Sequence, residues 1–207
     1  MSQATIAIID YEMGNLRSVQ KAFEAIGCSA TITRSTQVID DASHVVLPGV
    51  GAFGNCMQNL ERFGLASSVR KTIKVGKPFL GICLGLQLLF TKSEEFGVHY
   101  GLDILPGHVV KFRSTETTMK IPHMGWNQIR FTNPMPIFQG IPDGTYFYFV
   151  HSFYVKPDDQ TIIGTVTDYG ASFASGIWKD NLFACQFHPE KSQRWGIQIL
   201  KNFSLLT

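Results

Sequence analysis

The segment Gly81-Ile82-Cys83-Leu84-Gly85 places one thiol between two glycines, each two residues away. This is the spacing of a nucleophile elbow, with cysteine where such elbows usually carry serine. The sharp turn from strand to helix strains the backbone of the nucleophile, and glycines are needed where side chains would collide. A helix beginning after Cys83 would direct its free N–H groups at the sulfur and favour the thiolate. A buried structural cysteine would show the same pattern, so this segment alone leaves catalysis and packing equally open.

A cysteine nucleophile needs a base within hydrogen-bond reach, and the base needs an orienting partner. Two of the six histidines, His151 and His188, end aromatic-rich segments that we predict as strands. Only His188 has an acid close behind it, in Phe187-His188-Pro189-Glu190, where the proline stiffens the link that would hold Glu190 against the imidazole. We therefore favour His188 as the base and Glu190 as its orienting partner, with His151 as the alternative base.

The third requirement of this chemistry is a pair of N–H donors for an oxyanion. One donor would be the amide of Leu84, directly after the nucleophile. The other would come from Gly49-Val50-Gly51, where the glycines allow the N–H groups of Val50 and Gly51 to turn towards a ligand. Such a loop is more often a simple turn, and it lacks the lysine and the spacing of a nucleotide phosphate loop.

The composition is that of a globular protein close to neutrality. The chain has 207 residues, of which 44% are hydrophobic and 16% charged, with a formal net charge of +2. No block of Lys and Arg suggests nucleic acid or a membrane surface as a partner, and no apolar run has the roughly 20 residues of a membrane span. The four cysteines form no C-x-x-C pair, so we expect neither a metal site nor disulfides. The first residues lack a secretory signal pattern, so we expect a cytoplasmic protein.

Alternating strands and helices must position the reactive residues. In the first half we predict strands at 4–9, 28–33, 44–48 and 78–83, with helices at 15–26, at 55–75 with a break near Phe63-Gly64, and after Cys83. The second half begins with a loop at 97–106. Segments typical of strands follow at 108–113, 126–131, 145–150, 161–167, 172–178 and 182–187, and a helix closes the chain at 193–206.

This order predicts a single α/β domain over residues 1–207, with an open, mainly parallel central sheet, flanking helices and additional antiparallel strands. Ligands of such sheets bind beyond the carboxyl ends of the strands. Gly49, Cys83 and His188 all lie at such ends, which favours catalysis over packing for Cys83.

Taken together, Gly81–Gln87 and Phe187–Glu190 resemble the motifs of the class I glutamine amidotransferases, and the resemblance spans nearly the whole chain. It implies a Cys-His-Glu triad in which Cys83 attacks the side-chain amide of L-glutamine and forms a thioester. His188 would protonate the departing ammonia and then activate water, and Glu190 would orient His188. We expect no cofactor or metal to take part. The resemblance also implies that glutamine is held by Gln87 and by backbone groups around Gly51, Ser152 and Phe153.

A second set of motifs occurs at 9–18, 48–53, 120–127 and 188–192, with Pro122-His123-Met124-Gly125-Trp126-Asn127 as the discriminating piece. These motifs resemble the glutaminase subunits that feed imidazole glycerol phosphate synthesis in histidine biosynthesis. The resemblance implies a heterodimer with a (β/α)8-barrel cyclase subunit, which would receive the ammonia. The candidate interface residues are Asn15, His123, Trp126 and Lys191.

Within that candidate interface, Trp126 would be an anchor, and Lys191 would pair with an acid of the partner. The chain departs from the resemblance at Glu12, where a glycine is expected. That residue adds charge beside the presumed contact surface.

Three alternatives stay open at this point. The chain could be the glutaminase subunit of another pathway, such as anthranilate, aminodeoxychorismate or pyridoxal phosphate synthesis, although the motif at 122–127 disfavours this. It could be a stand-alone cysteine hydrolase acting on γ-glutamyl substrates. It could also be a binding module that has lost turnover, although the presence of Cys83, His188 and Glu190 speaks against that.

Overall fold

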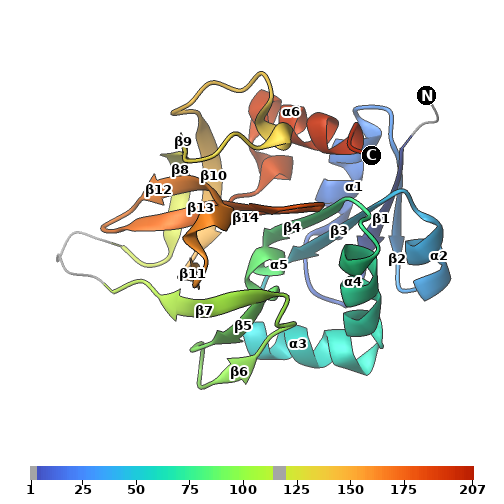
Figure 1. Cartoon of the computed structure of the whole chain (residues 1–207), viewed down its shortest axis with the longest axis horizontal. Coiled ribbons are helices and arrows are strands. Elements are labelled where there is room, and N and C mark those ends of the chain that lie inside the picture. The colour runs from blue at the N-terminus through green and yellow to red at the C-terminus, as the bar shows by residue number, and fades with distance from the viewer. Residues whose placement is uncertain (1–3, 114–119) are drawn as a thin grey trace.

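A computed structural model describes residues 4–113 and 120–207 of the chain. Twelve of the described strands form one mixed sheet. Its order is β2-β1-β3-β4-β14-β13-β11-β7-β5-β6, with β12 beside β13 and β9 beside β12. The other two described strands, β8 and β10, form a separate antiparallel ribbon. Figure 1 shows the first strands and their helices on one side and the β-rich second half on the other.

Five adjacent parallel strands form the part of the sheet that carries the elbow. They are β2 (Ser29–Thr33), β1 (Thr5–Ile9), β3 (His44–Gly49), β4 (Phe79–Cys83) and β14 (Leu182–Cys185). β3 and β4 are buried at every residue, as parallel strands with both faces covered must be. One face packs against α1 (Leu16–Glu24) and α6 (Gln193–Ser204); the other packs against α2 (Thr36–Asp41), α3 (Phe53–Arg62) and α4 (Leu65–Lys74).

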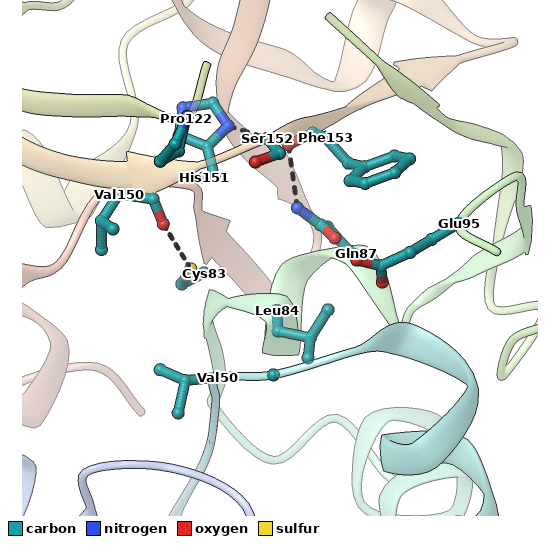
Figure 2. A pocket seen from close by; sticks show the side chains of 11 residues that line it. Val50, Cys83, Leu84, Gln87, Glu95, Pro122, Val150, His151, Ser152 and Phe153 are labelled. Carbon is teal, nitrogen blue, oxygen red and sulfur yellow. Dashed lines mark hydrogen bonds between the residues drawn. The ribbon is translucent and has the colours of Figure 1, made fainter. Parts of the chain in front are cut away.

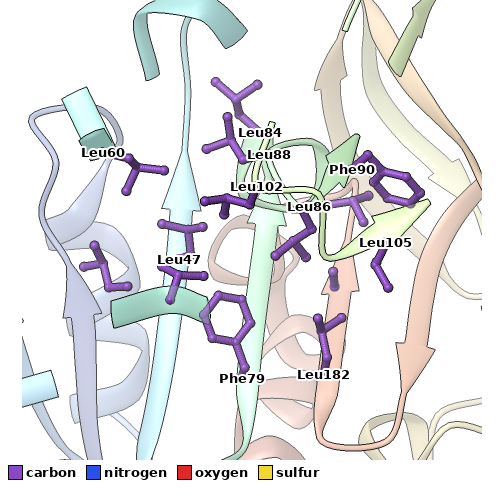
Figure 3. Close-up of a cluster of buried hydrophobic side chains, with 14 of the residues drawn as sticks. Leu47, Leu60, Phe79, Leu84, Leu86, Leu88, Phe90, Leu102, Leu105 and Leu182 are labelled. Carbon is purple, nitrogen blue, oxygen red and sulfur yellow. The ribbon is translucent and has the colours of Figure 1, made fainter. Parts of the chain in front are cut away.

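Each face of the sheet has its own apolar core. On the α1–α6 side the rings of Phe23 and Phe203 lie with centroids 6.3 Å apart. On the other side, leucines of the elbow helix and the turn after it pack among Leu47, Phe79 and Leu182 (Figure 3). Full burial of each such side chain contributes roughly 1.5–3 kcal/mol. The nucleophile is therefore attached to the best-buried part of the molecule.

The second half supplies antiparallel strands and the walls of the site. Its strands are β5 (Phe90–Ser93), β6 (His99–Tyr100), β7 (Leu105–Lys111), β8 (His123–Gln128), β9 (Arg130–Phe131), β10 (Tyr146–His151), β11 (Phe153–Pro157), β12 (Ile163–Asp168) and β13 (Ser172–Lys179). Three 3-10 turns accompany them: η1 (Pro136–Phe138), η2 (Gln160–Ile162) and η3 (Pro189–Lys191). Within the described residues, no helix is both long and apolar enough to span a membrane.

The predicted fold class is confirmed, because a parallel centre flanked by helices is extended by antiparallel strands. The predicted break near Gly64 is also confirmed, since this residue has φ of 68° between α3 and α4. The helix α2 was not predicted. It has only six residues, and its signal is the Ser35 cap, whose hydroxyl accepts from the amide of Val38 at 3.4 Å.

Two predictions for the middle of the chain are wrong. The helix after Cys83 is α5 (Leu84–Gln87), a single turn, and Phe90 already begins β5. The apolar surface all round this segment reflects burial, not a long helix. A helix this short has little macrodipole to stabilise a thiolate. The predicted loop at 97–106 contains β6 and the start of β7, and β11 lies in a segment for which no strand was predicted.

Gly85 allows the closest backbone approach at the elbow. A Cβ at Gly85 would overlap the carbonyl oxygen of Leu47 on β3, whereas a Cβ at Gly81 would lie 3.0 Å from the carbonyl oxygen of Gly85. The two glycines of the elbow motif thus differ in the space around them, and Gly85 is the stricter one.

We expect Gly85→Ala to lower the free energy of unfolding by at least ~3 kcal/mol, because the added methyl group meets fixed backbone. Gly81→Ala is the matched control and should cost less, about 1–2 kcal/mol. Unfolding in guanidinium chloride measures both. Equal losses for the two variants would show that the contact with Leu47 does not constrain the elbow.

Candidate active site

Cys83 lies where β4 turns into α5, with φ of 57° and ψ of −110°. This positive φ is the strained conformation expected of a nucleophile elbow. The residue is buried, with 6% of its surface exposed, and its sulfur lies at the base of a pocket of about 330 Å³ (Figure 2). The other lining residues are Val50, Gly51, Leu84, Gln87, Glu95, Pro122, Val150, His151, Ser152 and Phe153.

The sheet register brings the predicted catalytic segments to one edge. Gly49, the last residue of β3, is paired with Cys83, the last residue of β4. Cys185 at the end of β14 is paired with Ile82 on the other side of β4. His188 follows β14 by three residues. The carboxyl ends of three neighbouring parallel strands therefore supply the thiol, the glycine loop and the histidine.

His188 and Glu190 form a buried pair. Their side chains are 3% and 2% exposed, and Nδ1 of His188 lies 2.8 Å from Oε1 of Glu190. Burial disfavours the imidazolium, but interaction with Cys83 and with Glu190 outweighs it and raises the pKa of His188 to about 10. The Nε2 atom has no other hydrogen-bond partner among the described groups, so it is free to serve the sulfur. A cysteine nucleophile requires a base and an orienting acid of these types.

The turn that carries Glu190 is itself fixed. Pro189 begins η3, and the hydroxyl of Ser192 donates to the carbonyl of His188 at 2.7 Å. The same hydroxyl accepts from the amide of Tyr148 at 3.0 Å. The turn is thus held to β10 as well as to itself, which restricts the imidazole to one orientation.

His151 lies on the pocket wall but has other partners. Its Nδ1 is 2.8 Å from the carbonyl oxygen of Phe153, which can only accept, so Nδ1 carries the proton. Its Nε2 must then accept from Nδ1 of His123 at 2.9 Å. Nε2 of His123 in turn accepts from the amide of Asn127 at 3.2 Å. Both imidazoles are neutral and fully engaged, and the geometry favours His188 as the base.

Gln87 lies one turn after the nucleophile and is held by two hydrogen bonds. Its Nε2 donates to the carbonyl oxygen of Phe153 at 3.0 Å and to Oε1 of Gln186 at 3.0 Å. Its own Oε1 is therefore the group left to accept from a ligand in the pocket. Phe153 and Ser152 border the same pocket.

Two further residues of the site were missed from the sequence. Glu95 lines the pocket, and its Oε2 accepts from the amide of Phe53 at 2.6 Å; nothing in its sequence context indicates this. Gln186 is completely buried next to Cys83. It had a usable signal, because it is the one strongly polar residue in the apolar run 182–187.

The predicted oxyanion donors border the pocket. Leu84 is the first residue of α5, and the first amides of a helix have no partner within it. Val50 and Gly51 face the same space. The buried hydroxyl of Tyr11 donates to the carbonyl of Pro48 at 2.8 Å, which anchors the start of their loop. The thiol of Cys56 approaches the carbonyl of Val50 at 3.9 Å and holds that carbonyl towards α3. Their role as donors stays a prediction.

Of the predicted interface residues, Asn15, Trp126 and Lys191 are exposed. The side chains of Trp126 and Lys191 both lie near the ring of Tyr148. Tyr148 lies with its centroid 6.2 Å from that of Trp126 and 5.8 Å from Nζ of Lys191.

The structure corrects the placement of His123. This residue is only 3% exposed, because it faces inward at the start of β8, whereas Met124 and Trp126, which follow it on the same strand, are exposed. The imidazole of His123 therefore offers little surface to a partner.

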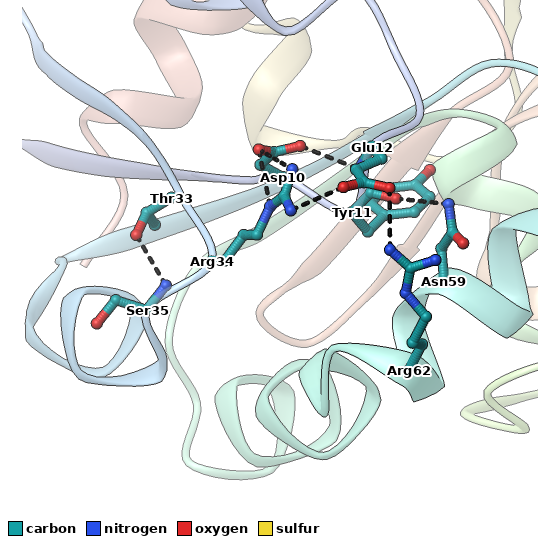
Figure 4. Close-up of polar contacts among 8 residues, drawn as sticks. All are labelled: Asp10, Tyr11, Glu12, Thr33, Arg34, Ser35, Asn59 and Arg62. Atoms are coloured by element: carbon teal, nitrogen blue, oxygen red, sulfur yellow. Dashed lines mark hydrogen bonds and ion pairs between the residues drawn. The ribbon is translucent and has the colours of Figure 1, made fainter.

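Glu12 adopts φ of 65° in the loop after β1, which explains why a glycine would suit this position. Its carboxylate is held by Arg34 at 2.9 Å and by Arg62 at 3.3 Å, and Arg34 also contacts Asp10 at 2.9 Å (Figure 4). These ion pairs are partly exposed, so each contributes little to stability. Together they fix where the extra charge lies.

The buried histidine pair predicts a pH-dependent stability. Burial lowers the pKa of His151 to about 3 and that of His123 to about 4, from an ordinary value of 6.5. In the unfolded chain both imidazoles therefore bind protons at higher pH than in the folded chain. The stability they provide is complete above pH 6.5 and should decline as the pH falls towards 4, by ~1.4 kcal/mol per pH unit for each histidine.

Urea unfolding of the wild type and of His151→Gln at several pH values between 7 and 4 measures this decline. The variant lacks one of the two titrating groups, so its free energy of unfolding should fall less steeply. If the free energies of unfolding of the two proteins fall equally with pH, the claim that both buried histidines are neutral is contradicted.

Comparisons with known proteins show to which family the chain belongs. The family model described as glutamine amidotransferase class-I matches residues 7–206. The chain is 54% identical over 202 residues to the imidazole glycerol phosphate synthase subunit HisH of Syntrophotalea carbinolica, covering 96% of this chain and 98% of the relative. It is 53% identical over 206 residues to the subunit of the same name from Geobacter metallireducens, covering 98% of each.

Solved structures give the same fold at lower identity. A crystal structure of a glutamine amidotransferase superposes with a TM-score of 0.73 at 15% identity, over 96% of this chain and 99% of that one. PurLQS from Thermotoga maritima gives a TM-score of 0.73 at 18% identity, over 98% of each chain. The family model, which matches almost the whole chain, and these relatives place the chain in the class-I glutamine amidotransferase family.

Proposed function

We propose that this chain hydrolyses L-glutamine to glutamate and ammonia through Cys83, His188 and Glu190, and delivers the ammonia to a cyclase partner. The observation that carries the proposal is the strained thiol of Cys83, whose interaction with the buried His188–Glu190 pair raises the pKa of that histidine to about 10. A thiolate and an imidazolium held together in this way are the reactants of acyl transfer. The family match over residues 7–206 supports treating the chain as one domain.

In the first half of the reaction the sulfur of Cys83 bonds to the amide carbon of glutamine. The carbonyl oxygen becomes an oxyanion, which the amide of Leu84 and an amide of Val50 or Gly51 stabilise. His188 gives its proton to the amide nitrogen, the C–N bond breaks, and ammonia leaves a thioester on Cys83. Glu190 keeps the imidazole oriented throughout.

In the second half a water molecule attacks the thioester carbon. His188, now neutral, accepts the proton of that water, a second oxyanion forms, and the C–S bond breaks. Glutamate leaves, and the thiolate and imidazolium are restored. Atoms balance as glutamine plus water giving glutamate plus ammonia.

The remaining pocket groups suit the other end of glutamine. Glu95 offers a carboxylate, and Gln87 offers a free Oε1, so both would accept from the α-ammonium group. Backbone groups of Gly51, Ser152 and Phe153 would bind the rest of the amino acid. Pocket size agrees, because about 330 Å³ suits a single amino acid.

The partner we propose is a (β/α)8-barrel cyclase subunit that forms imidazole glycerol phosphate and aminoimidazole carboxamide ribotide in histidine biosynthesis. Support comes from relatives more than 50% identical over nearly their whole length, which are named as subunits of imidazole glycerol phosphate synthase. These names favour this pathway over anthranilate, aminodeoxychorismate or pyridoxal phosphate synthesis. Such a heterodimer would work in the cytoplasm.

The face we propose for the cyclase includes Asn15, Trp126 and Lys191. Met124 and Tyr146 add exposed apolar area on the same β8–β10 ribbon, at 65% and 53% exposure. A large aromatic residue surrounded by such area is a suitable anchor for a partner. Pro122, at the start of the same motif, lines the glutaminase pocket, so the proposed interface and the site of ammonia release are adjacent.

Cys83→Ala should lower glutamine-dependent activity by at least about 10⁴-fold, because no other group can form the thioester. Product formation by the complex from free ammonium should survive, since only the ammonia source is removed. Both rates are measured on the complex with the cyclase. Retained glutamine-dependent synthesis in the variant would disprove the mechanism.

The glycines on either side of Val50 permit a peptide flip, so we expect the oxyanion loop to respond to the partner. Glutaminase rates should rise by at least about 10-fold when the cyclase and its ligand are added. Trp126→Ala should weaken that response by raising the cyclase concentration needed, and Tyr100→Ala, an exposed aromatic residue on β6, is the matched control. Equal rates with and without the cyclase would indicate a stand-alone hydrolase.

A further inference from the structure

Gln186 is a buried polar residue that the mechanism above does not use. It follows directly after β14, and its side chain has no exposed surface. Its backbone N–H donates to the carbonyl oxygen of Ser175 at 2.9 Å, which fixes the residue to β13. A buried primary amide is costly unless its donors and acceptor are used. The partners that it uses are in the catalytic site.

The hydrogen-bond pattern determines which end of this amide faces the sulfur. The carbonyl oxygen of Phe153 can only accept, so the group of Gln87 beside it must be Nε2. That same Nε2 lies 3.0 Å from Gln186 and needs an acceptor there, which must be Oε1 of Gln186. The other end of Gln186, its Nε2, therefore points at Sγ of Cys83, 3.7 Å away. One backbone carbonyl thus sets the direction of the whole chain of amides.

Two polar groups contact the sulfur of Cys83, and they favour opposite protonation states of it. The carbonyl oxygen of Val150, 3.9 Å from Sγ, can accept only from the protonated thiol. Nε2 of Gln186 can only donate, so its hydrogen bond strengthens when the sulfur carries a negative charge. The Val150 carbonyl therefore favours the protonated thiol, and the Gln186 amide favours the reactive thiolate.

We infer that Gln186 is a catalytic residue whose amide N–H stabilises the Cys83 thiolate and, through Gln87, links the sulfur to the substrate pocket. The hydrogen bond compensates for the single-turn α5, which provides little helix dipole. It acts twice in each turnover, before attack on the substrate and again when sulfur leaves the thioester carbon. Because Oε1 of Gln186 also holds Gln87, loss of the amide disturbs both the nucleophile and the grip on the substrate.

The test is the pH dependence of alkylation of Cys83 by iodoacetamide, with modification located by peptide mass spectrometry. The titratable groups around the sulfur are His188 and Glu190, Cys185 on β14, Tyr11 after β1, Cys56 on α3, and His151 and Glu95 on the pocket wall. All of them are retained in each variant. A change in the midpoint therefore reports the substituted residue.

Gln186→Met keeps the length of the side chain and removes the donor. The midpoint for alkylation of Cys83 should move up by about 1–2 pH units, the effect of losing a hydrogen bond to a charged atom. In the complex with the cyclase, kcat should fall by about 10–100-fold and KM for glutamine should rise. Gln198→Met, a glutamine on α6 whose amide bonds to Asn202, is the matched control and should leave all three unchanged.

A folded Gln186→Met protein with an unchanged midpoint would overturn the inference. If that variant does not fold, Gln186→Leu also removes the donor without adding a charge, and its midpoint should also rise. An experiment on the wild type needs neither variant. In NMR spectra, the side-chain amide proton resonances of Gln186 should shift as Cys83 titrates. Resonances that do not change during this titration would also overturn the inference.

This inference rests on the proposed function, but the two can fail separately. The alkylation midpoint is measured on the isolated chain and requires no glutamine. A raised midpoint without any glutaminase activity would keep the role of Gln186 and reject glutamine as the substrate. Glutaminase activity that is unchanged in Gln186→Met would keep glutamine as the substrate and reject the role of Gln186.

Discussion

The backbone of Cys83 is held at a positive φ, and the catalytic geometry depends on that constraint. Gly85 makes it possible, because only a residue without Cβ fits against the carbonyl of Leu47 on the neighbouring strand. The strain is supported by a core of leucines on one side of β4 and of aromatic rings on the other. The thiol therefore projects from the end of a fully buried strand into the pocket. Strain of this kind persists only where surrounding structure over-determines it.

Around that fixed sulfur, neutral and charged groups are kept apart. His188 and Glu190 form the charged pair on one side. On the other, a chain of neutral hydrogen bonds runs from Asn127 through His123 and His151 to the carbonyl of Phe153. Gln87 and Gln186 continue it from that carbonyl to the sulfur. This chain of hydrogen bonds begins on β8, the strand that exposes Met124 and Trp126. It therefore connects the proposed partner surface to the nucleophile.

The sequence indicates which residues come together at the sheet edge better than it predicts the strands and helices that connect them. The elbow and the His188–Glu190 pair follow from local spacing, and strand order then predicts that they meet at one sheet edge. Gln186 and Glu95 could not be placed in this way, because their partners are distant in sequence. His123 was assigned to the surface because its motif suggested contact, whereas the alternation of β8 turns it inward. The length of α5 was overestimated because a buried apolar segment gives no period that separates helix from strand.

The central claim is that Cys83 is the nucleophile that glutamine meets in this pocket. Incubation with 6-diazo-5-oxo-L-norleucine, a glutamine analogue that alkylates a nucleophile placed at its reactive carbon, tests it most directly. Peptide mass spectrometry should find one label, on Cys83, with its rate reduced by excess L-glutamine and abolished in Cys83→Ala. A label on Cys28, Cys56 or Cys185, or labelling that glutamine does not slow, would contradict the account.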